Sequence, residues 1–126
     1  MKTFISFDGI KIFVGENAKD NDALTQSAYP NEWWMHASDC PGAHVVISYE
    51  GDVLPKETKT DAAALAAHYS KARGKGGMTR VDLCRVRDVY GDGAKTYGRV
   101  LLDGHVMPLS MFMNKEKNRL ERLFLK

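Results

Sequence analysis

The stretch TDAAALAAHYSKARG, residues 60–74, constrains the fold more than any other part of this sequence. Alanine and leucine are strong helix formers, and Thr60 or Asp61 can cap the start of a helix that Gly74 ends. The small alanine side chains let such a helix lie close against a sheet. The stretch therefore predicts one central helix over about residues 61–73.

Apolar runs on both sides of this helix indicate β-strands. Asp8-Gly9 separates two such runs near the N-terminus, and this pair is typical of a tight hairpin because both turn positions need positive φ. Asp103-Gly104 repeats the pattern later in the chain. Further strands are predicted over residues 43–49 and 79–90. In the second of these the apolar alternation shifts partway, which indicates a bulge or burial on both faces.

Two other segments have the apolar spacing of helices, namely residues 19–27 and the tail 114–126. Together these elements predict an α+β fold with a mainly antiparallel sheet, one central helix and a C-terminal helix. The length of 126 residues is typical of one domain. We therefore expect residues 1–126 to form a single domain that ends in a helical tail over about 111–126.

The composition excludes several classes of protein. Apolar residues make up 44% and charged residues 27% of the chain, a balance that permits a buried core and argues against a disordered or membrane protein. The sequence contains no run of about 18 apolar residues and no signal-peptide pattern. Cys40 and Cys84 are too few for a disulfide framework. We expect a cytoplasmic protein with no membrane partner.

The net charge of +2 hides an uneven distribution. Residues 1–60 carry five lysines against nine acids, whereas residues 61–126 carry thirteen Lys and Arg against seven acids. The excess is densest over residues 71–87, where Asp82 is the single acid among six cations. This pattern favours a polyanionic partner, although a solvated basic surface has the same pattern.

The loop RGKGG, residues 73–77, lacks the order of a nucleotide P-loop and fits better as a loop near nucleic-acid phosphates.

The stretch NEWWMHASDCPGAHVVI, residues 31–47, places two tryptophans side by side. Neighbouring residues of a strand point to opposite faces, so Trp34 and His36 share the face that Trp33 does not. We expect Trp33 to belong to the core, and Trp34 with His36 to form an exposed platform on which a base stacks. The alternative is that both indole rings are core.

Metal binding and catalysis are weaker interpretations of the same stretch. His36, Cys40 and His44 are spaced by four residues, but Pro41 breaks the helix that would align them. No CxxC or HxxxH pair anchors a metal site. Neither the surroundings of Cys40 nor any pair of carboxylates is typical of a catalytic centre. We therefore expect no catalytic residue, no metal and no cofactor, and the chain is not expected to be an enzyme.

Two ordered sets of residues carry a resemblance to a known family. The first set lies in IKIFVGENAKDNDALT and consists of Gly15, Asn17, Asp20, Asn21, Asp22, Leu24 and Thr25. The second lies in NEWWMHASDCPGAHV and consists of Glu32, Trp34, His36, Pro41, Gly42, His44 and Val45. With the helix sequence AAALAAHYSKAR, they resemble the NFACT-R domain, the RNA-binding domain of NFACT proteins, which are ribosome-quality-control factors of the RqcH and NEMF kind. The resemblance covers about residues 8–109.

The resemblance implies an RNA-binding module whose partners are tRNA or another structured RNA, and the ribosome. Cations at the helix end and in the adjoining loop would contact phosphates, Trp34 or His36 would stack on a base, and other polar residues would form hydrogen bonds. The residues expected to contact nucleic acid are Lys19, Asn21, Trp34, His36, His44, Lys71, Arg73, Lys75, Lys95 and Arg99.

Two other functions compete with RNA binding. One is a protein-interaction adaptor that docks through the apolar tail helix, residues 114–126. The other is a small metal-dependent enzyme with His36 and His44 as ligands. Within the motif, we expect Gly15 to form a turn, and Asn17 and Asp20 to brace a loop without contacting RNA.

Overall fold

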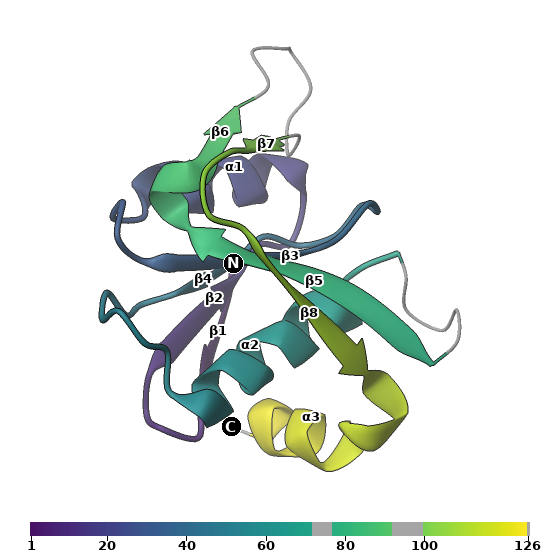
Figure 1. The fold of residues 1–126 in the computed structure, drawn as a ribbon. Helices are drawn as coiled ribbons and strands as arrows, with labels where there is room; N and C mark the ends of the chain where they lie inside the picture. Colours follow the sequence, from purple (N-terminus) through teal and green to yellow (C-terminus); the bar gives the residue numbers. More distant parts are fainter. Residues whose placement is uncertain (72–76, 92–99, 126) are drawn as a thin grey trace.

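The structure, a computed structural model, describes residues 1–71, 77–91 and 100–125. Within these ranges, six strands form one antiparallel sheet in the order β1-β2-β4-β3-β5-β8, and β6 pairs with β7 in a separate sheet (Figure 1). The strands of the large sheet are β1 (Lys2–Ile5), β2 (Lys11–Val14), β3 (Trp33–Ala37), β4 (Val45–Ile47), β5 (Met78–Arg85) and β8 (Met107–Phe112). The small sheet consists of β6 (Val89–Gly91) and β7 (Val100–Leu102).

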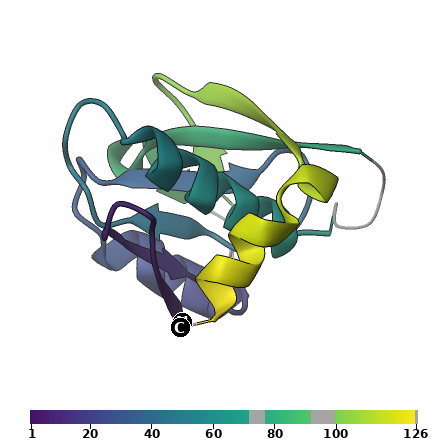
Figure 2. The same cartoon turned by 90° about the horizontal axis from the view of Figure 1, so that it is seen from below.

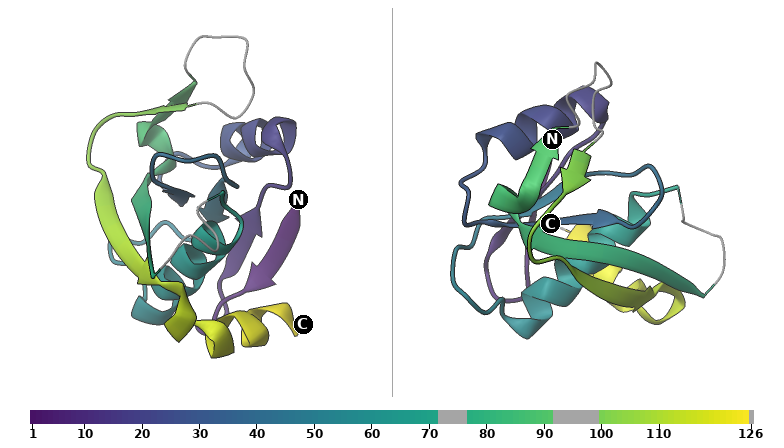
Figure 3. Two further views of the ribbon diagram at one scale, coloured as in Figure 1. Left: turned by 90° about the vertical axis from the view of Figure 1, so that its right-hand side faces the viewer. Right: turned by 45° about the horizontal axis from the view of Figure 1, so that its top comes forward.

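Three helices in the described part of the chain are α1 (Ala18–Ser27), α2 (Lys56–His68) and α3 (Lys117–Phe124). Helix α2 lies across one face of the large sheet with α3 beside it, which is clearest from below (Figure 2). Helix α1 and the small sheet lie over the opposite face (Figure 3). The predicted α+β class is thus confirmed, with a central antiparallel sheet that is covered on both sides.

The two tryptophans of β3 lie on opposite faces of the sheet, as the alternation predicted. Trp33 packs in the larger core with Met35, Leu65 and other side chains beneath α2. Trp34 packs in a smaller core with Leu24 of α1, Val46, Cys84 and Val86. Both faces of β3 are therefore buried, which confirms the alternative that both indole rings belong to the core.

The first Asp-Gly pair forms the predicted hairpin, and the second does not. β1 pairs with β2 from Lys2↔Val14 to Ile5↔Lys11, and Gly9 in the turn has a φ of +82°. Gly104 also has positive φ, +98°. However, β7 pairs with β6 and β8 pairs with β5, so the Asp103-Gly104 turn carries the chain from one sheet to the other.

Helix α2 begins and ends about five residues earlier than predicted. It begins at Lys56, because the carboxylate of Asp8 in the β1–β2 turn accepts hydrogen bonds from the backbone N–H (3.1 Å) and the hydroxyl (2.7 Å) of Thr58. This distant side chain therefore caps the helix. The helix ends at His68, because the Tyr69 carbonyl accepts from the Ala43 N–H at 2.9 Å.

The predicted strand over 79–90 is interrupted. β5 ends at Arg85, a 3-10 turn spans Val86–Asp88, and β6 follows. The shift in apolar alternation therefore reflects burial on both faces, one of the two predicted alternatives, because Leu83 lies in the larger core whereas Cys84 and Val86 lie in the smaller one, and the 3-10 turn begins at Val86. This turn directs the chain out of the large sheet and over the face that carries Trp34.

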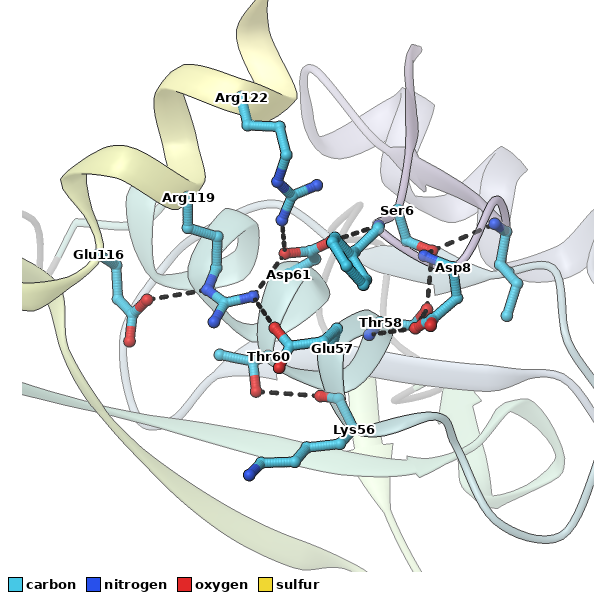
Figure 4. A network of polar contacts seen from close by, with 12 residues as sticks. Ser6, Asp8, Lys56, Glu57, Thr58, Thr60, Asp61, Glu116, Arg119 and Arg122 are labelled. Carbon is cyan, nitrogen blue, oxygen red and sulfur yellow. Dashed lines mark hydrogen bonds and ion pairs between the residues drawn. The ribbon is translucent and has the colours of Figure 1, made fainter.

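The C-terminal helix is part of the fold, which leaves less apolar surface for the adaptor alternative than the sequence pattern indicated. Its side chain Leu123 is 1% exposed and lies in the larger core, where Leu120 packs against it. The buried carboxylate of Asp61 accepts hydrogen bonds from Arg119 (2.8 Å), Arg122 (2.5 Å) and the backbone N–H of Phe7 (2.8 Å) (Figure 4). Leu120 and Leu123 of the apolar side are thus covered by the larger core, whereas Phe124 and Leu125 remain 43% and 83% exposed.

Candidate functional site

A cleft of about 1070 Å³ lies between the start of α1, strand β3, the loop before β4 and strand β7. Its lining includes the motif residues Asn21, Trp34, His36 and Gly42, together with Asp39 and Asp82. The motif residues that lie far apart along the chain therefore meet around one hollow. We call this hollow the cleft below.

Asn21 holds one wall of the cleft together. Its side-chain Oδ1 accepts a hydrogen bond from the His44 N–H (3.0 Å), and its Nδ2 donates to the Gly42 carbonyl (3.3 Å). Gly15 passes so close that a Cβ there would lie 1.9 Å from Asn21 Oδ1. Asn21, expected to contact RNA, thus braces the protein, and Gly15 is required for close approach and not for a turn.

The start of α1 has the structural role expected of its motif residues. The side chain of Asn17 caps the helix by accepting from the Asp20 N–H at 2.8 Å. The carboxylate of Asp20 in turn accepts from the Glu16 N–H at 2.9 Å. These two hydrogen bonds fix the edge of the cleft.

Trp34 does not form the exposed platform predicted from the sequence. Its side chain is 0% exposed, and its indole Nε1 donates to the hydroxyl of Thr25 at 3.2 Å. The same hydroxyl lies 2.8 Å from Nδ1 of His44, which is also 0% exposed. The prediction that Trp34 stacks on a base is wrong, because α1 and the small sheet cover the face on which it lies.

His36 is the ring that remains partly accessible. It lies parallel to Trp34, with ring centroids 5.8 Å apart, and meets the His44 ring edge-on at 5.6 Å. Burial lowers the pKa of His36, and backbone hydrogen bonds with Ala37 and Gly42 and the charge of Asp82 oppose only part of that shift. The imidazole is therefore neutral at neutral pH, so it can both donate and accept a hydrogen bond.

Among the residues that the structure describes, carboxylates outnumber cations around the cleft. Glu16, Asp39 and Asp82 contribute to the lining, whereas Lys2 is the basic residue there, and its Nζ lies 3.8 Å from a Glu16 oxygen. The Asp82 carboxylate accepts from the Ser38 hydroxyl at 2.8 Å. A phosphate would meet repulsion in this position, so the arrangement suits the neutral polar part of a ligand.

The predicted phosphate-binding cations lie elsewhere or cannot be placed. Lys71 is exposed at the rim of the cleft, where its backbone N–H donates to the Pro41 carbonyl at 2.8 Å. Lys19 is exposed on α1 and does not contribute to the cleft. The other four predicted cations lie outside the described residues, namely Arg73, Lys75, Lys95 and Arg99.

The structure does not bring a metal centre together within the residues that it describes. No group of three or more His, Cys, Asp or Glu side chains in these ranges could hold a metal ion. Burial, with the charges of Asp88 and Asp82, raises the pKa of the Cys84 thiol to about 12. None of the described helices is long and apolar enough to span a membrane.

Comparisons with known proteins place the motif in a wider context. Residues 1–108 match the model of the NFACT protein RNA binding domain. The chain is 43% identical over 89 residues to the Rqc2 homolog RqcH of Streptococcus suis, which covers 69% of this chain and 16% of that protein. It is 36% identical over 105 residues to the Rqc2 homolog RqcH of Bacillus subtilis, a match that covers 82% of this chain and 18% of that protein.

A solved structure has the same fold. The C-terminal part of the fibronectin/fibrinogen-binding protein from Streptococcus suis superposes with a TM-score of 0.86 at 33% sequence identity. The superposition covers 97% of this chain and 48% of that one. The likeness thus includes the C-terminal segment that follows residue 108.

Proposed function

This chain belongs to the family of NFACT protein RNA-binding domains, and on that premise we propose that it binds tRNA or another ribosome-associated RNA in ribosome quality control. The observation that carries the proposal is the coincidence of the family motif with the cleft, since residues from α1, β3 and the loop before β4 line one hollow. The chain spans less than a fifth of the RqcH proteins that it matches.

The charges of the site support a division of the ligand between two surfaces. The neutral ring of His36, among carboxylates in the cleft, suits a base edge or a ribose hydroxyl. Phosphates suit the cations outside the cleft, among them Lys71, whose backbone N–H donates to the carbonyl of the cleft residue Pro41. We therefore propose that the RNA backbone passes over the rim while one nucleoside enters the cleft.

We also propose that the chain acts by binding and not by catalysis. The polar groups around the cleft are held in the fold, because Thr25, Trp34 and His44 are joined by hydrogen bonds and Asn21 braces two backbone groups. The Cys84 thiol, with its raised pKa, is a weak nucleophile. RNA recovered after incubation with the protein should be intact and unmodified by mass spectrometry.

A salt titration of RNA binding tests the proposal. Fluorescence anisotropy with labelled tRNA and with unstructured oligonucleotides gives the affinity at several salt concentrations. With a slope of about −0.7 per neutralised phosphate of a single strand, four or five contacts predict a log–log slope of about −3. Binding that is independent of salt, or no binding to any RNA, would contradict the proposal.

Lys71→Ala tests whether the RNA backbone passes over the rim of the cleft. This variant should weaken binding to all RNA sequences alike and reduce the slope by about 0.7. Lys56→Ala is a matched control, because Lys56 is exposed at the opposite end of α2. Equal effects of the two substitutions would show that Lys71 has no special place in the interface.

A further inference from the structure

The outer face of strands β5 and β8 carries an exposed patch that the cleft does not include. Met78 lies opposite Phe112, and Arg80 lies opposite Ser110, so these four side chains share one face. All four are exposed. The alternating residues Thr79, Val81 and Met111 are buried, the last two in the larger core beneath α2. We call the four exposed residues the β5–β8 patch.

The patch contains an aromatic ring, an apolar neighbour and one cation, Arg80, and a second cation, Lys115, lies beside it. Phe112 is 46% and Met78 is 47% exposed, and they are direct cross-strand neighbours. Lys115 lies with its Nζ 5.4 Å from the centroid of the Phe112 ring. Among the described residues neither Arg80 nor Lys115 forms an ion pair. The patch thus combines a stacking surface with unpaired positive charge.

The patch and the cleft lie on the same face of the sheet. Asp82 follows Arg80 by two residues on β5 and therefore lies on the same face. It is opposite Pro108 in β8 and opposite His36 in β3. Asp82 and His36 both line the cleft. At about 3.3 Å per residue, Met78 and Asp82 are about 13 Å apart along β5, so one extended strand of RNA can reach both.

We propose that the β5–β8 patch is a stacking site for an unpaired nucleobase, with Arg80 and Lys115 holding the adjacent phosphates. The proposal rests on the proposed function, that the chain binds RNA. Bases stack on aromatic side chains exposed on a sheet face, and cations beside them hold the backbone. Lys115 is a flexible cation near the ring, and it can pair with the phosphate of the nucleotide that stacks there.

The observations favour RNA over a protein partner at this place. The apolar part of the patch is limited to two side chains, whereas the charged part is uniformly positive. A partner strand that paired with the free edge of β8 would meet Pro108, which has no N–H to donate. A polyanion with flat bases matches both the charge and the aromatic ring.

Substitution of Phe112 tests the stacking directly. Phe112→Ala should weaken binding of an unstructured oligonucleotide at least about five-fold with no change in the salt slope, because stacking carries no counterion release. Phe112→Trp should retain the affinity, and its new indole fluorescence should be quenched by the oligonucleotide, while Trp33 and Trp34 are buried and give a constant background. Thermal melts confirm that each variant is folded.

The matched control is Tyr29→Ala. Tyr29 is 67% exposed and lies at the opposite end of β5, where the Arg87 N–H donates to the carbonyl of the adjacent Pro30. This variant should bind RNA as the wild type does. Arg80→Ala combined with Lys115→Ala should reduce the salt slope by about 1.4, at about 0.7 per lost phosphate contact.

The outcomes separate this inference from the proposed function. If the wild type binds no RNA, the proposed function is wrong and the stacking site falls with it. If the wild type binds RNA but Phe112→Ala binds equally well and Phe112→Trp is not quenched, the stacking site alone is wrong. An equal loss of affinity for Tyr29→Ala would also overturn the stacking site.

Discussion

The imidazole of His36 lies parallel to the indole of Trp34, with their centroids 5.8 Å apart and 14° between the ring planes. Trp34 is fully buried beneath, so it supports His36 and does not itself meet a ligand. The outermost ring of the stack is thus a neutral imidazole in a cleft bordered by carboxylates. Three of the four predictions below concern this stack and the residues that hold it.

The first prediction concerns the pH dependence of stability through His36. Burial holds the pKa of His36 in the folded protein below its ordinary value of 6.5. As the pH falls below 6.5, the unfolded chain therefore takes up a proton at this position before the folded protein does. The free energy of unfolding should be highest above 6.5 and should fall as the pH drops from 6.5 toward the lowered pKa.

Urea denaturation at pH values between 7.5 and 5 measures this dependence, and His36→Gln should remove part of it. An NMR titration of the His36 ring gives the pKa directly and separates it from the other histidines. A midpoint at or above 6.5 in the folded protein would contradict the buried, neutral imidazole.

The second prediction reverses the expectation from the sequence for the two tryptophans. Because both indoles are buried, Trp33→Ala and Trp34→Ala should each lower the free energy of unfolding by about 3–5 kcal/mol. Trp34→Phe should cost less than Trp34→Ala, because most of the apolar volume remains. Its remaining cost comes in part from the lost hydrogen bond between Nε1 and the Thr25 hydroxyl. Urea unfolding of the three variants measures these costs. A stable Trp34→Ala protein with lost RNA affinity would show instead that the indole is accessible.

For strand β3, the sequence predicted which side chains share a face, but it did not decide whether one or both faces are buried. Alternation in β3 correctly placed Trp33 and Trp34 on opposite faces. It could not show that the second face is covered, because the cover comes from Leu24 in α1 and from Val100 and Leu102 far along the chain. Local patterns specify which side chains share a face, whereas burial depends on contacts between distant segments.

The boundaries of helix α2 and the accessibility of the cleft residues also depend on contacts between distant segments. Helix α2 was recognised from its alanines, but its start depends on the carboxylate of Asp8, about fifty residues earlier. The motif predicted which residues gather at the site. It did not distinguish His36, which is partly accessible, from Asn21 and His44, which are hydrogen-bonded within the protein.

The third prediction concerns the attachment of α3. Asp61 is fully buried and accepts hydrogen bonds from Arg119 and Arg122 (Figure 4). Asp61→Asn removes the charge that both guanidinium groups face, so it should cost about 3 kcal/mol, the lower end for a broken buried ion pair, because both arginines are partly exposed. Urea unfolding measures the cost, and hydrogen exchange should show faster opening of α3.

Glu57→Gln is the control for this network. Glu57 also pairs with Arg119, at 2.9 Å, but its side chain is 40% exposed. Its loss should cost less than about 1 kcal/mol. Equal costs for the two variants would mean that burial of Asp61 does not determine the strength of the contact.

The fourth prediction concerns the close approach of Gly15 to Asn21. A Cβ at position 15 would lie 1.9 Å from Asn21 Oδ1 and 3.1 Å from its Cα, so rotation of the side chain alone does not relieve the clash. Gly15→Ala should displace Asn21 and leave the buried N–H of His44 without its partner, at a cost of about 1–3 kcal/mol.

The NMR signals of the His36 and His44 rings should shift in Gly15→Ala because the wall of the cleft moves. Gly77→Ala, where a Cβ meets none of the described residues within 4 Å, should change stability by less than about 0.5 kcal/mol. In the double variant Gly15→Ala with Asn21→Ala, the clashing oxygen is absent, so the combined cost should be smaller than the sum of the two single costs. Strictly additive costs would show that the two residues do not press on each other and that Gly15 is required for another reason.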